Sequence, residues 1–413
     1  MPETRRLDAA GHVLLFLARL LLEAGADSEH VRRRIEALAE RLGFAAQLFL
    51  GSERLLLMLG DDQAYRTRMG HAIGAMGIDA GRLVALEQVA AMLASGAITV
   101  ADADARLFVI AARKPAYPAW LTVLAVAATA AALARLFSAS WPVVGAAFLA
   151  GLVNTVLRRA LPRWGVVPAA AAVLTAAISG MAGALPLRLI GADPTLALVA
   201  AGMILVPGVP LINGVRDLVR GHAGVGLARL ANGGMIVLAI AAGLATASLA
   251  TGVHLPVALS TPNLRLPWDS LFAAIAAFGF SILFNAPRRT ILPIVLTGAL
   301  GHGLRTALMA VGADIAVATA AGAMLAGLLA LWTGRRLRAP WTALAFPGVV
   351  AMVPGSYAFR GLIGAMDILR SGTETSPALL AASAAALIGA AILTVAIGIG
   401  LLLASAIGAG MGD

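Results

Sequence analysis

From residue 119 onward, long apolar stretches alternate with short polar loops. Each stretch approaches the roughly 20 residues that an α-helix needs to cross the hydrocarbon core of a membrane. Only 13% of the chain is charged, whereas about 25% is usual in soluble domains. The pattern predicts an all-α polytopic membrane protein with ten transmembrane helices. The expected spans are 119–137, 141–157, 165–185, 195–214, 229–250, 269–286, 290–312, 315–333, 342–362 and 377–406.

The net charge of +10 is explained by membrane topology. In a soluble chain it would suggest nucleic acid, but here arginines stand in the short loops between apolar spans, where they orient a membrane protein. We therefore expect a lipid bilayer as partner, and no nucleic acid. The chain has no cysteine, which excludes disulfides and thiol chemistry. No His/Cys spacing suggests a metal, and no motif suggests another cofactor.

Residues 1–114 predict a small soluble α+β domain that precedes the membrane region. Leucines repeat on one face of the first helix, and Arg19 and Glu23 interrupt its apolar run. This pattern favours an amphipathic helix over a cleaved signal peptide. Lys114 and Pro115 mark the end of the domain. Further helices are expected over 28–42, 79–95 and 99–112, with two strands within 44–59 and a third over 68–77.

The N-terminal domain holds side chains that enzymes use, but not in a catalytic pattern. No G-x-S-x-G motif, metal-spaced cluster or phosphate-binding loop connects them. We therefore expect a regulatory or assembly domain, and a protein that is not an enzyme. The side chains are those of Ser52, His12, His71, Asp61 and Asp62.

A broken apolar stretch, ILVPGVPLINGVRD at 204–217, has a counterpart later in the chain, AMVPGSYAFRG. Pro207 aligns with Pro354, an offset of 354 − 207 = 147 residues. The same offset aligns the Leu-Arg pair that ends at Arg158 with the pair that ends at Arg305. Matches of this kind are rare by chance in an alanine- and leucine-rich chain, so the sequence predicts a duplication.

The duplication divides the membrane region into a first repeat, 115–260, and a second repeat, 261–413. Each repeat has five spans, and an odd number means that the second repeat enters the membrane from the opposite side. Loop charges agree, because matched loops carry opposite basic bias and cytoplasmic loops collect Lys and Arg. We expect two inverted repeats in a bacterial inner membrane, with the N-terminal domain and the C-terminus cytoplasmic. The basic loops follow spans two, four, six and eight, at Arg158, Arg159, Arg163, Arg216, Arg220, Arg288, Arg289, Arg335, Arg336 and Arg338.

The two Pro-Gly breaks predict a central binding site. Proline removes a backbone N–H and crowds the preceding turn, and irregular backbone survives at membrane depth only beside protein or a water-filled cavity. Freed N–H groups and helix N-termini suit a carboxylate, and freed carbonyls suit an ammonium group or a cation. The alternative is that these residues only kink or pack the helices. The break residues are Pro207, Gly208, Pro210, Pro354 and Gly355.

Three stretches resemble the bacterial threonine/serine exporter family: EAGADSEHVRRRIEALAERLG, ILVPGVPLINGVRDLVRGHAGVGLARL and AMVPGSYAFRGLIGA. The resemblance covers residues 10–405. It implies a ten-span inner-membrane exporter of threonine and serine, driven by protons as an antiporter. Members have also been associated with dicarboxylate export. The motif positions it carries over are Pro207, Gly208, Pro210, Asn213, Arg216, Asp217, Pro354, Gly355 and Arg360.

Ionisable residues inside a membrane are costly and usually functional, and two readings are open for each one near the breaks. Arg360, at the repeat position of Asn213, suits a substrate carboxylate or extends to the interface. Asp217 is a candidate proton carrier or the partner in a helix-end ion pair. Arg216 stands beside it near the cytoplasmic end. Arg158 is a topological anchor or a lining residue of the path.

Three further polar residues complete the candidates for substrate binding and translocation. Arg305 is expected deeper in the membrane than its repeat partner. His302, one turn earlier, is a candidate proton relay because imidazole titrates near pH 6.5, or it is a packed, hydrogen-bonded histidine. Asn154 lines the path or bonds a neighbouring helix.

The function that we expect is secondary active export of a small-molecule substrate by alternating access. Threonine or serine is the first candidate, a small dicarboxylate such as succinate is the second, and a passive channel is a third reading. Protons are the expected coupling ion. Whether the protein forms a homo-oligomer stays open at this stage.

Overall fold

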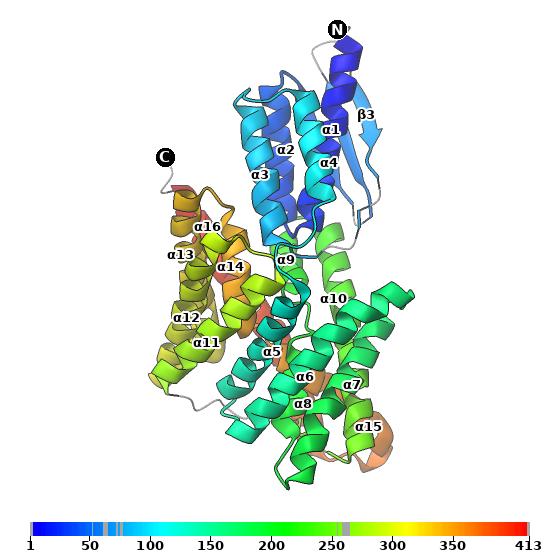
Figure 1. Cartoon of the computed structure of the whole chain (residues 1–413), viewed down its shortest axis with the longest axis vertical. Coiled ribbons are helices and arrows are strands. Elements are labelled where there is room, and N and C mark those ends of the chain that lie inside the picture. Colours follow the sequence, from blue (N-terminus) through cyan, green and yellow to red (C-terminus); the bar gives the residue numbers. More distant parts are fainter. Residues whose placement is uncertain are drawn as a thin grey trace.

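The computed structural model describes residues 3–51, 53–60, 65–71, 73–74, 77–253, 255–257 and 265–410. A small domain with a sheet stands on one end of a larger body of helices (Figure 1). The last helix of the chain ends on the side of the body that faces this domain (Figure 1). We call this side the domain side of the body.

The described part of the N-terminal domain packs helices against an antiparallel sheet in the order β1-β2-β3. The Asp27 side chain accepts a hydrogen bond from the His30 backbone at 3.1 Å and caps the second helix. That helix stops before Gly43, which has a φ of +87°. The elements are α1 (Glu3–Glu23), α2 (Ser28–Arg41), β1 (Ala45–Leu50), β2 (Leu55–Gly60), β3 (Tyr65–Met69), α3 (Ala80–Ala94) and α4 (Val100–Ala111).

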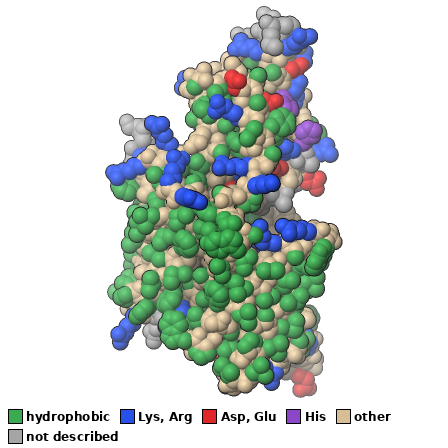
Figure 2. Space-filling model, in the orientation of Figure 1, with side chains coloured by type: hydrophobic (Ala, Val, Ile, Leu, Met, Phe, Trp, Pro, Cys, Tyr) green, Lys and Arg blue, Asp and Glu red, His purple; other side chains and the backbone are tan. Residues whose placement is uncertain are grey.

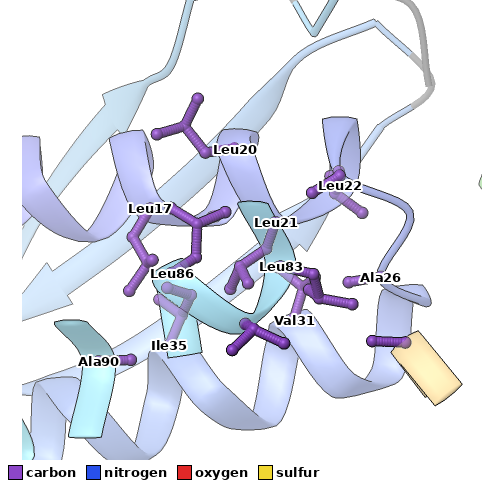
Figure 3. Close-up of a cluster of buried hydrophobic side chains, with 14 of the residues drawn as sticks. Leu17, Leu20, Leu21, Leu22, Ala26, Val31, Ile35, Leu83, Leu86 and Ala90 are labelled. Atoms are coloured by element: carbon purple, nitrogen blue, oxygen red, sulfur yellow. The ribbon is translucent and has the colours of Figure 1, made fainter. Parts of the chain in front are cut away.

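The leucine face of α1 forms the centre of this domain's core. Leu17 and Leu21 of α1 lie against Ile35 of α2 and Leu86 of α3, and all four are buried (Figure 3). Burial of each such side chain contributes about 1.5–3 kcal/mol. The apolar face of the amphipathic helix α1 is therefore buried in the core of the N-terminal domain.

The third strand lies earlier than we expected. We placed it over 68–77, but β3 spans Tyr65–Met69. Its pairing runs from Tyr65 opposite Gly60 to Met69 opposite Leu56. Beyond this pair the Gly70 N–H still donates to the carbonyl of Leu55, the first residue of β2, at 2.8 Å, and β2 offers no residue for a longer ladder. Of the candidate catalytic residues, Ser52, Asp61 and Asp62 lie outside the described residues.

The body of the molecule consists of long apolar helices. Eight are long and apolar enough to cross a membrane, and two bent pairs raise this number to ten if each pair is one span, among the described residues. The pairs are bent by 56° and 47°. The helices are α5 (Ala119–Leu136), α6 (Trp141–Ala160), α7 (Pro168–Leu189), α8 (Thr195–Met203), α9 (Gly208–Val219), α10 (Ala223–Thr251), α11 (Leu266–Leu283), α12 (Arg288–Ala310), α13 (Ile315–Leu337), α14 (Trp341–Val349), α15 (Gly355–Ser371) and α16 (Pro377–Gly410).

Helix bounds in the two halves of the body follow the 147-residue offset. Both ends of α5 map onto the ends of α11, and the first residues of α6, α7 and α9 map onto those of α12, α13 and α15. Left-handed backbone positions follow it too. Ser138 (φ 61°) maps onto Asn285 (φ 57°), and Gly191 (φ 70°) maps onto Arg338 (φ 49°). Helix ends and turn geometry thus repeat along the chain.

Helices α5 and α11 pack side by side in opposite directions. Before α5, the Ala116 N–H donates to the Asn285 side chain, just after α11, at 2.6 Å. At the other end, the Arg135 guanidinium of α5 lies 5.6 Å from the ring centre of Phe272 in α11. The start of each helix therefore lies near the end of the other.

The surface separates by chemistry. Apolar side chains cover the visible face of the body, whereas Lys and Arg gather where the body meets the N-terminal domain (Figure 2). Large apolar side chains such as Leu292 and Val317 are exposed on the body, by 66% and 62%. In water such a surface would drive association, and it is the surface that lipid covers.

Candidate functional site

Both bent pairs break at a Val-Pro-Gly sequence. Pro207 caps α9 with φ −78° and ψ 66°, and Pro354 caps α15 with φ −78° and ψ 48°. After each proline the glycine N–H turns back to the valine carbonyl, at 2.8 Å in both halves. Because proline has no N–H to continue the helix, this tight turn satisfies the valine carbonyl locally.

The two breaks contact each other reciprocally. A Cβ placed on Gly208 would lie 2.9 Å from Val353 Cγ2, and one placed on Gly355 would lie 2.6 Å from Val206 Cγ2. The backbone of each break therefore rests on the valine of the other, and both contacts require glycine. Helices α9 and α15 begin at this contact. Helix α9 runs from it toward the N-terminal domain, and α15 lies at the opposite end of the body (Figure 1).

A cavity of about 440 Å³ adjoins the first break. Pro207, Gly208 and Pro210 line it, together with side chains of α6, α7 and α11 and the N-terminal domain residue Ile78. Of the described residues that line it, Arg158 alone is charged. The predicted site residues Pro207, Gly208, Pro210 and Arg158 thus share one cavity, while Pro354 and Gly355 lie across the break contact.

Asn154 supports the end of α8. Its side chain on α6 is fully buried, and its Nδ2 donates to the Ala201 carbonyl at 3.2 Å. That carbonyl belongs to the last turn of α8, just before the break, where helical partners run out. Asn154 of α6 therefore contacts a neighbouring helix at the end that leads into the break.

The polar residues that follow the first break face the N-terminal domain. The Asp217 carboxylate accepts hydrogen bonds from the backbone N–H and the hydroxyl of Ser28, both at 3.0 Å. It also pairs with Arg229 of α10 at 2.7 Å. Asn213 Nδ2 donates to the Gly25 carbonyl at 3.0 Å. We call these contacts between 25–29 and α9–α10 the domain junction.

Arg216 is a buried cation of the domain junction. Its guanidinium is 1% exposed, pairs with Asp27 at 3.1 Å and stacks over Trp341. Arg220 contacts the other oxygen of Asp27 at 2.9 Å. The motif residues Asn213, Arg216 and Asp217 therefore hold two domains together rather than line the cavity. The signal that sequence reasoning lacked is that their partners stand about 190 residues away.

Charged partners keep the two acids that the N-terminal domain brings to the junction, Asp27 and Glu29, ionised. Burial disfavours the charge of Asp27, but Arg216 and neighbouring cations outweigh it and hold the pKa of Asp27 well below its ordinary value. Burial likewise opposes the charge of Glu29, and partners led by Arg32 lower the pKa of Glu29 to about 2. For His30 burial also acts against the charged form, yet the hydrogen bond that its ring donates to the Glu87 carboxylate raises the pKa of His30.

A second polar cluster lies in the other half of the body. His302 Nδ1 of α12 is 2.7 Å from Asp269 Oδ2 of α11, and both residues are buried. Arg305 Nε donates to the Thr319 hydroxyl at 2.9 Å. Asp269 was missed by the sequence analysis, which treated it only as the first residue of a span. Its place after Leu-Pro-Trp in an apolar helix was the available signal.

Arg360 is buried in α15, the helix that begins at the second break. Tyr357, one turn before it, acts electrostatically on both Arg360 and Arg305. The predicted residues His302, Arg305 and Arg360 are thus gathered in the second half of the body. They form a group separate from the cavity at the first break.

No group of three or more His, Cys, Asp or Glu side chains is placed to hold a metal ion in the described part of the chain. In the N-terminal domain, His12 lies 3.4 Å from Asp104, and His71 is exposed.

Comparison with known proteins agrees with the membrane architecture. A probable threonine/serine exporter of Mycobacterium tuberculosis is 29% identical over 297 residues, which cover 69% of this chain and 56% of that protein. A probable succinate transporter subunit of Klebsiella aerogenes is 34% identical over 140 residues, 33% of this chain and 54% of that protein. The chain thus spans about half the length of these curated relatives. No solved structure matches it.

Family comparison covers both halves of the molecule. One threonine/serine exporter family matches residues 12–251, from α1 of the N-terminal domain through α10. A second, described as threonine/serine exporter, ThrE, matches residues 269–407, from α11 to α16. Together they contain both breaks and the domain junction. The chain therefore belongs to the threonine/serine exporter family.

Proposed function

We propose that this protein is a secondary active exporter of small amino acids of the threonine and serine type. The observation that carries the proposal is the reciprocal contact of the two Val-Pro-Gly breaks beside a cavity. Two helix N-termini meet there, each with positive partial charge. Broken helices that meet near the middle of a membrane body are the usual site architecture of secondary transporters.

An inverted repeat underlies this site in the proposal. Three observations support it: helix bounds follow a constant offset, the equivalent helices α5 and α11 run antiparallel, and the break contact is made twice with exchanged partners. Exchanged partners are the signature of two-fold symmetry. Such a fold exposes its centre alternately to the two sides when one repeat exchanges conformation with the other.

The arginine distribution supports a cytoplasmic N-terminal domain in an inner membrane. Arg335 and Arg338 of the α13 end and Arg289 of α12 line a cavity with His30 and Arg34 of that domain. The domain side of the body therefore collects the basic loops, which cytoplasmic sides do. Helix α16 ends on the same side, because the Gly408 carbonyl accepts a hydrogen bond from Arg335.

The substrate carries a carboxylate in this proposal. The N-termini of α9 and α15 and the Arg158 guanidinium attract an anion, and carbonyls near the break suit an ammonium group. The cavity of about 440 Å³ lies within the ~300–1,000 Å³ usual for small-molecule sites. Export by proton antiport would carry one substrate outward as protons move inward.

A small dicarboxylate such as succinate is the second candidate substrate. It is favoured by a lining in which, among the described residues, Arg158 is charged and no acid appears. A cavity of this kind offers no carboxylate partner for an ammonium group. The similarity to a succinate transporter subunit points the same way.

The test is counterflow in proteoliposomes that contain the purified full chain. Vesicles loaded with unlabelled threonine, serine or succinate are diluted into the same labelled compound. Uptake driven by the trans substrate supports a carrier and identifies the substrate class, whereas equal uptake with and without internal substrate indicates a channel. We expect Arg158→Gln to reduce counterflow at least tenfold. Arg159→Gln is the matched control, since Arg159 is not among the residues that line the cavity.

A further inference from the structure

Among the described polar clusters of the membrane body, the pair of Asp269 and His302 is not explained by domain docking or by support of a break. Asp269 is 3% exposed and His302 is 5% exposed. Their 2.7 Å contact joins α11 to α12. A carboxylate and an imidazole so placed can hold one or two protons between them.

The pair lies far from the domain side of the body. Helix α11 ends against the N-terminal domain, where the Phe284 carbonyl accepts a hydrogen bond from the Ala80 N–H at 2.8 Å. Asp269 stands 283 − 269 = 14 residues before the last residue of α11. At 1.5 Å per residue this is roughly 20 Å along the helix. In the proposed orientation, the pair is therefore near the external side, from which protons would enter.

Several cationic and titratable groups face the pair from the helices around it. Arg305, on the same helix α12 as His302, interacts electrostatically with Asp269 and with Tyr357 of α15. Tyr357 in turn interacts with Arg360 on its own helix. Arg135 at the end of α5 lies over Phe272, about one turn from Asp269. Helix α13 contributes the Thr319 hydroxyl that holds Arg305. These cations can balance the negative charge that remains when the pair loses a proton.

The pair is also connected to the second break by close packing. Gly298 stands one turn before His302 on α12. A Cβ on Gly298 would lie 3.3 Å from the Gly348 carbonyl, which belongs to the last turn of α14. That turn leads through a short 3-10 helix, Val350–Met352, into the break at Pro354. A change in the attraction between α11 and α12 would therefore be transmitted to the helix that enters the break.

The equivalent positions in the first half of the body do not hold such a pair. The 147-residue offset places Thr122 at the position of Asp269 (269 − 147 = 122) and Thr155 at the position of His302 (302 − 147 = 155). Both threonine hydroxyls donate to carbonyls of their own chain segment, at Pro118 and Gly151. The two halves therefore share the break but differ in this titratable element.

We propose that Asp269 and His302 form the proton site that couples transport to the proton gradient. This inference rests on the proposed exporter function. With one proton, His302 Nδ1–H donates to the Asp269 carboxylate and the pair carries a charge of −1. A proton from the external side adds to His302 Nε2, which makes the pair neutral, and leaves toward the cytoplasm after the change of access. No other reactant takes part.

The experiment separates coupling from substrate exchange. The purified full chain and its Asp269→Asn and His302→Gln variants are placed in proteoliposomes. Two activities are measured for the substrate that the wild type exchanges: counterflow without a pH gradient, and net movement driven by an imposed pH gradient. We expect both variants to keep counterflow within about threefold and to lose gradient-driven movement at least tenfold. The control Thr155→Val should keep both activities.

The outcomes distinguish the two levels of the proposal. A wild type that exchanges none of threonine, serine or succinate refutes the exporter function itself. A wild type that exchanges substrate, with variants that retain gradient-driven movement, overturns the proton-site assignment. So does parallel loss of both activities in variants that are monodisperse in detergent. If Asp269→Asn does not fold, His302→Gln carries the same comparison, and Asp269→Glu should retain coupling with a shifted pH profile.

Discussion

The Asp27→Asn substitution tests whether the ion pairs at the domain junction hold the N-terminal domain on α9. Asparagine caps helices about as well as aspartate, so the cap of α2 at His30 should survive. The carboxylate partner of Arg216 and Arg220 disappears, and Arg216 is 1% exposed. Removal of one partner of a buried ion pair costs about 3–5 kcal/mol. The carboxylate of Asp217 nearby offsets part of the charge left on Arg216, so we expect the domain junction to lose about 3 kcal/mol of stability.

The direction in which this stabilisation changes with pH follows from the lowered pKa of Asp27. The folded protein keeps this carboxylate ionised below its ordinary pKa of 3.8. Its stabilisation is therefore complete above that value and is lost as the pH falls through the lower, folded-state pKa. At pH 7 the full effect of the substitution should be visible.

Hydrogen exchange measured by mass spectrometry is the assay. The Ser28 N–H donates to Asp217 across the junction, so its exchange reports opening of this contact. At about 1.4 kcal/mol per tenfold, a loss of about 3 kcal/mol accelerates exchange of the peptide around Ser28 about 100-fold. Asp314→Asn is the matched control, since Asp314 likewise caps a helix, α13, through the Ala316 N–H at 2.8 Å. Exchange around Ser28 that is unchanged in Asp27→Asn would refute the reasoning.

Three further substitutions test other contacts. Gly355→Ala places a Cβ 2.6 Å from Val206 Cγ2. The resulting overpacking should cost about 1–3 kcal/mol of stability and lower both the thermal midpoint and the rate of counterflow. A second substitution, Val206→Ala, should restore both quantities. A double variant no better than the single one would contradict the reciprocal contact. Asn154→Ala leaves the Ala201 carbonyl without its side-chain donor, which should cost about 1–3 kcal/mol of stability and lower the thermal midpoint. An unchanged midpoint would contradict the role of Asn154 in holding the end of α8. His30 has a raised pKa, so its stabilisation is present below its ordinary pKa and is lost as the pH rises through the folded-state value. His30→Gln should remove this loss of N-terminal domain stability at rising pH, measured as the thermal midpoint against pH, and an identical pH profile in the variant would count against it.

Periodicity and composition were enough to predict the spans and the breaks. A helix that must cross a membrane needs a long apolar run, and a Pro-Gly pair inside such a run interrupts the helix. The offset between Pro207 and Pro354 reappears in the bounds of the helices. The sheet of the N-terminal domain was also predicted, although its last strand was placed a few residues late.

The roles of single polar residues could not be predicted in the same way. Asn213, Arg216 and Asp217 stand beside the break in sequence, which suggested a path for substrate. Their partners at 25–28 are distant in sequence, and only the folded chain brings them together. Asp269 was overlooked for a related reason, because a carboxylate at a helix start is usually hydrated. Its burial depends on His302, 33 residues away.

The one-sided docking of the N-terminal domain has a consequence for the energies of the proposed cycle. Two equal halves that exchange conformations would give inward-facing and outward-facing states of equal energy. Here α9 bears the domain junction, whereas its equivalent α15 lies at the opposite end of the body, away from the domain. A junction worth about 3 kcal/mol more in one state would populate that state about 100 to 1. In the proposed cycle, the docked domain would thereby favour one of the two states as the resting state.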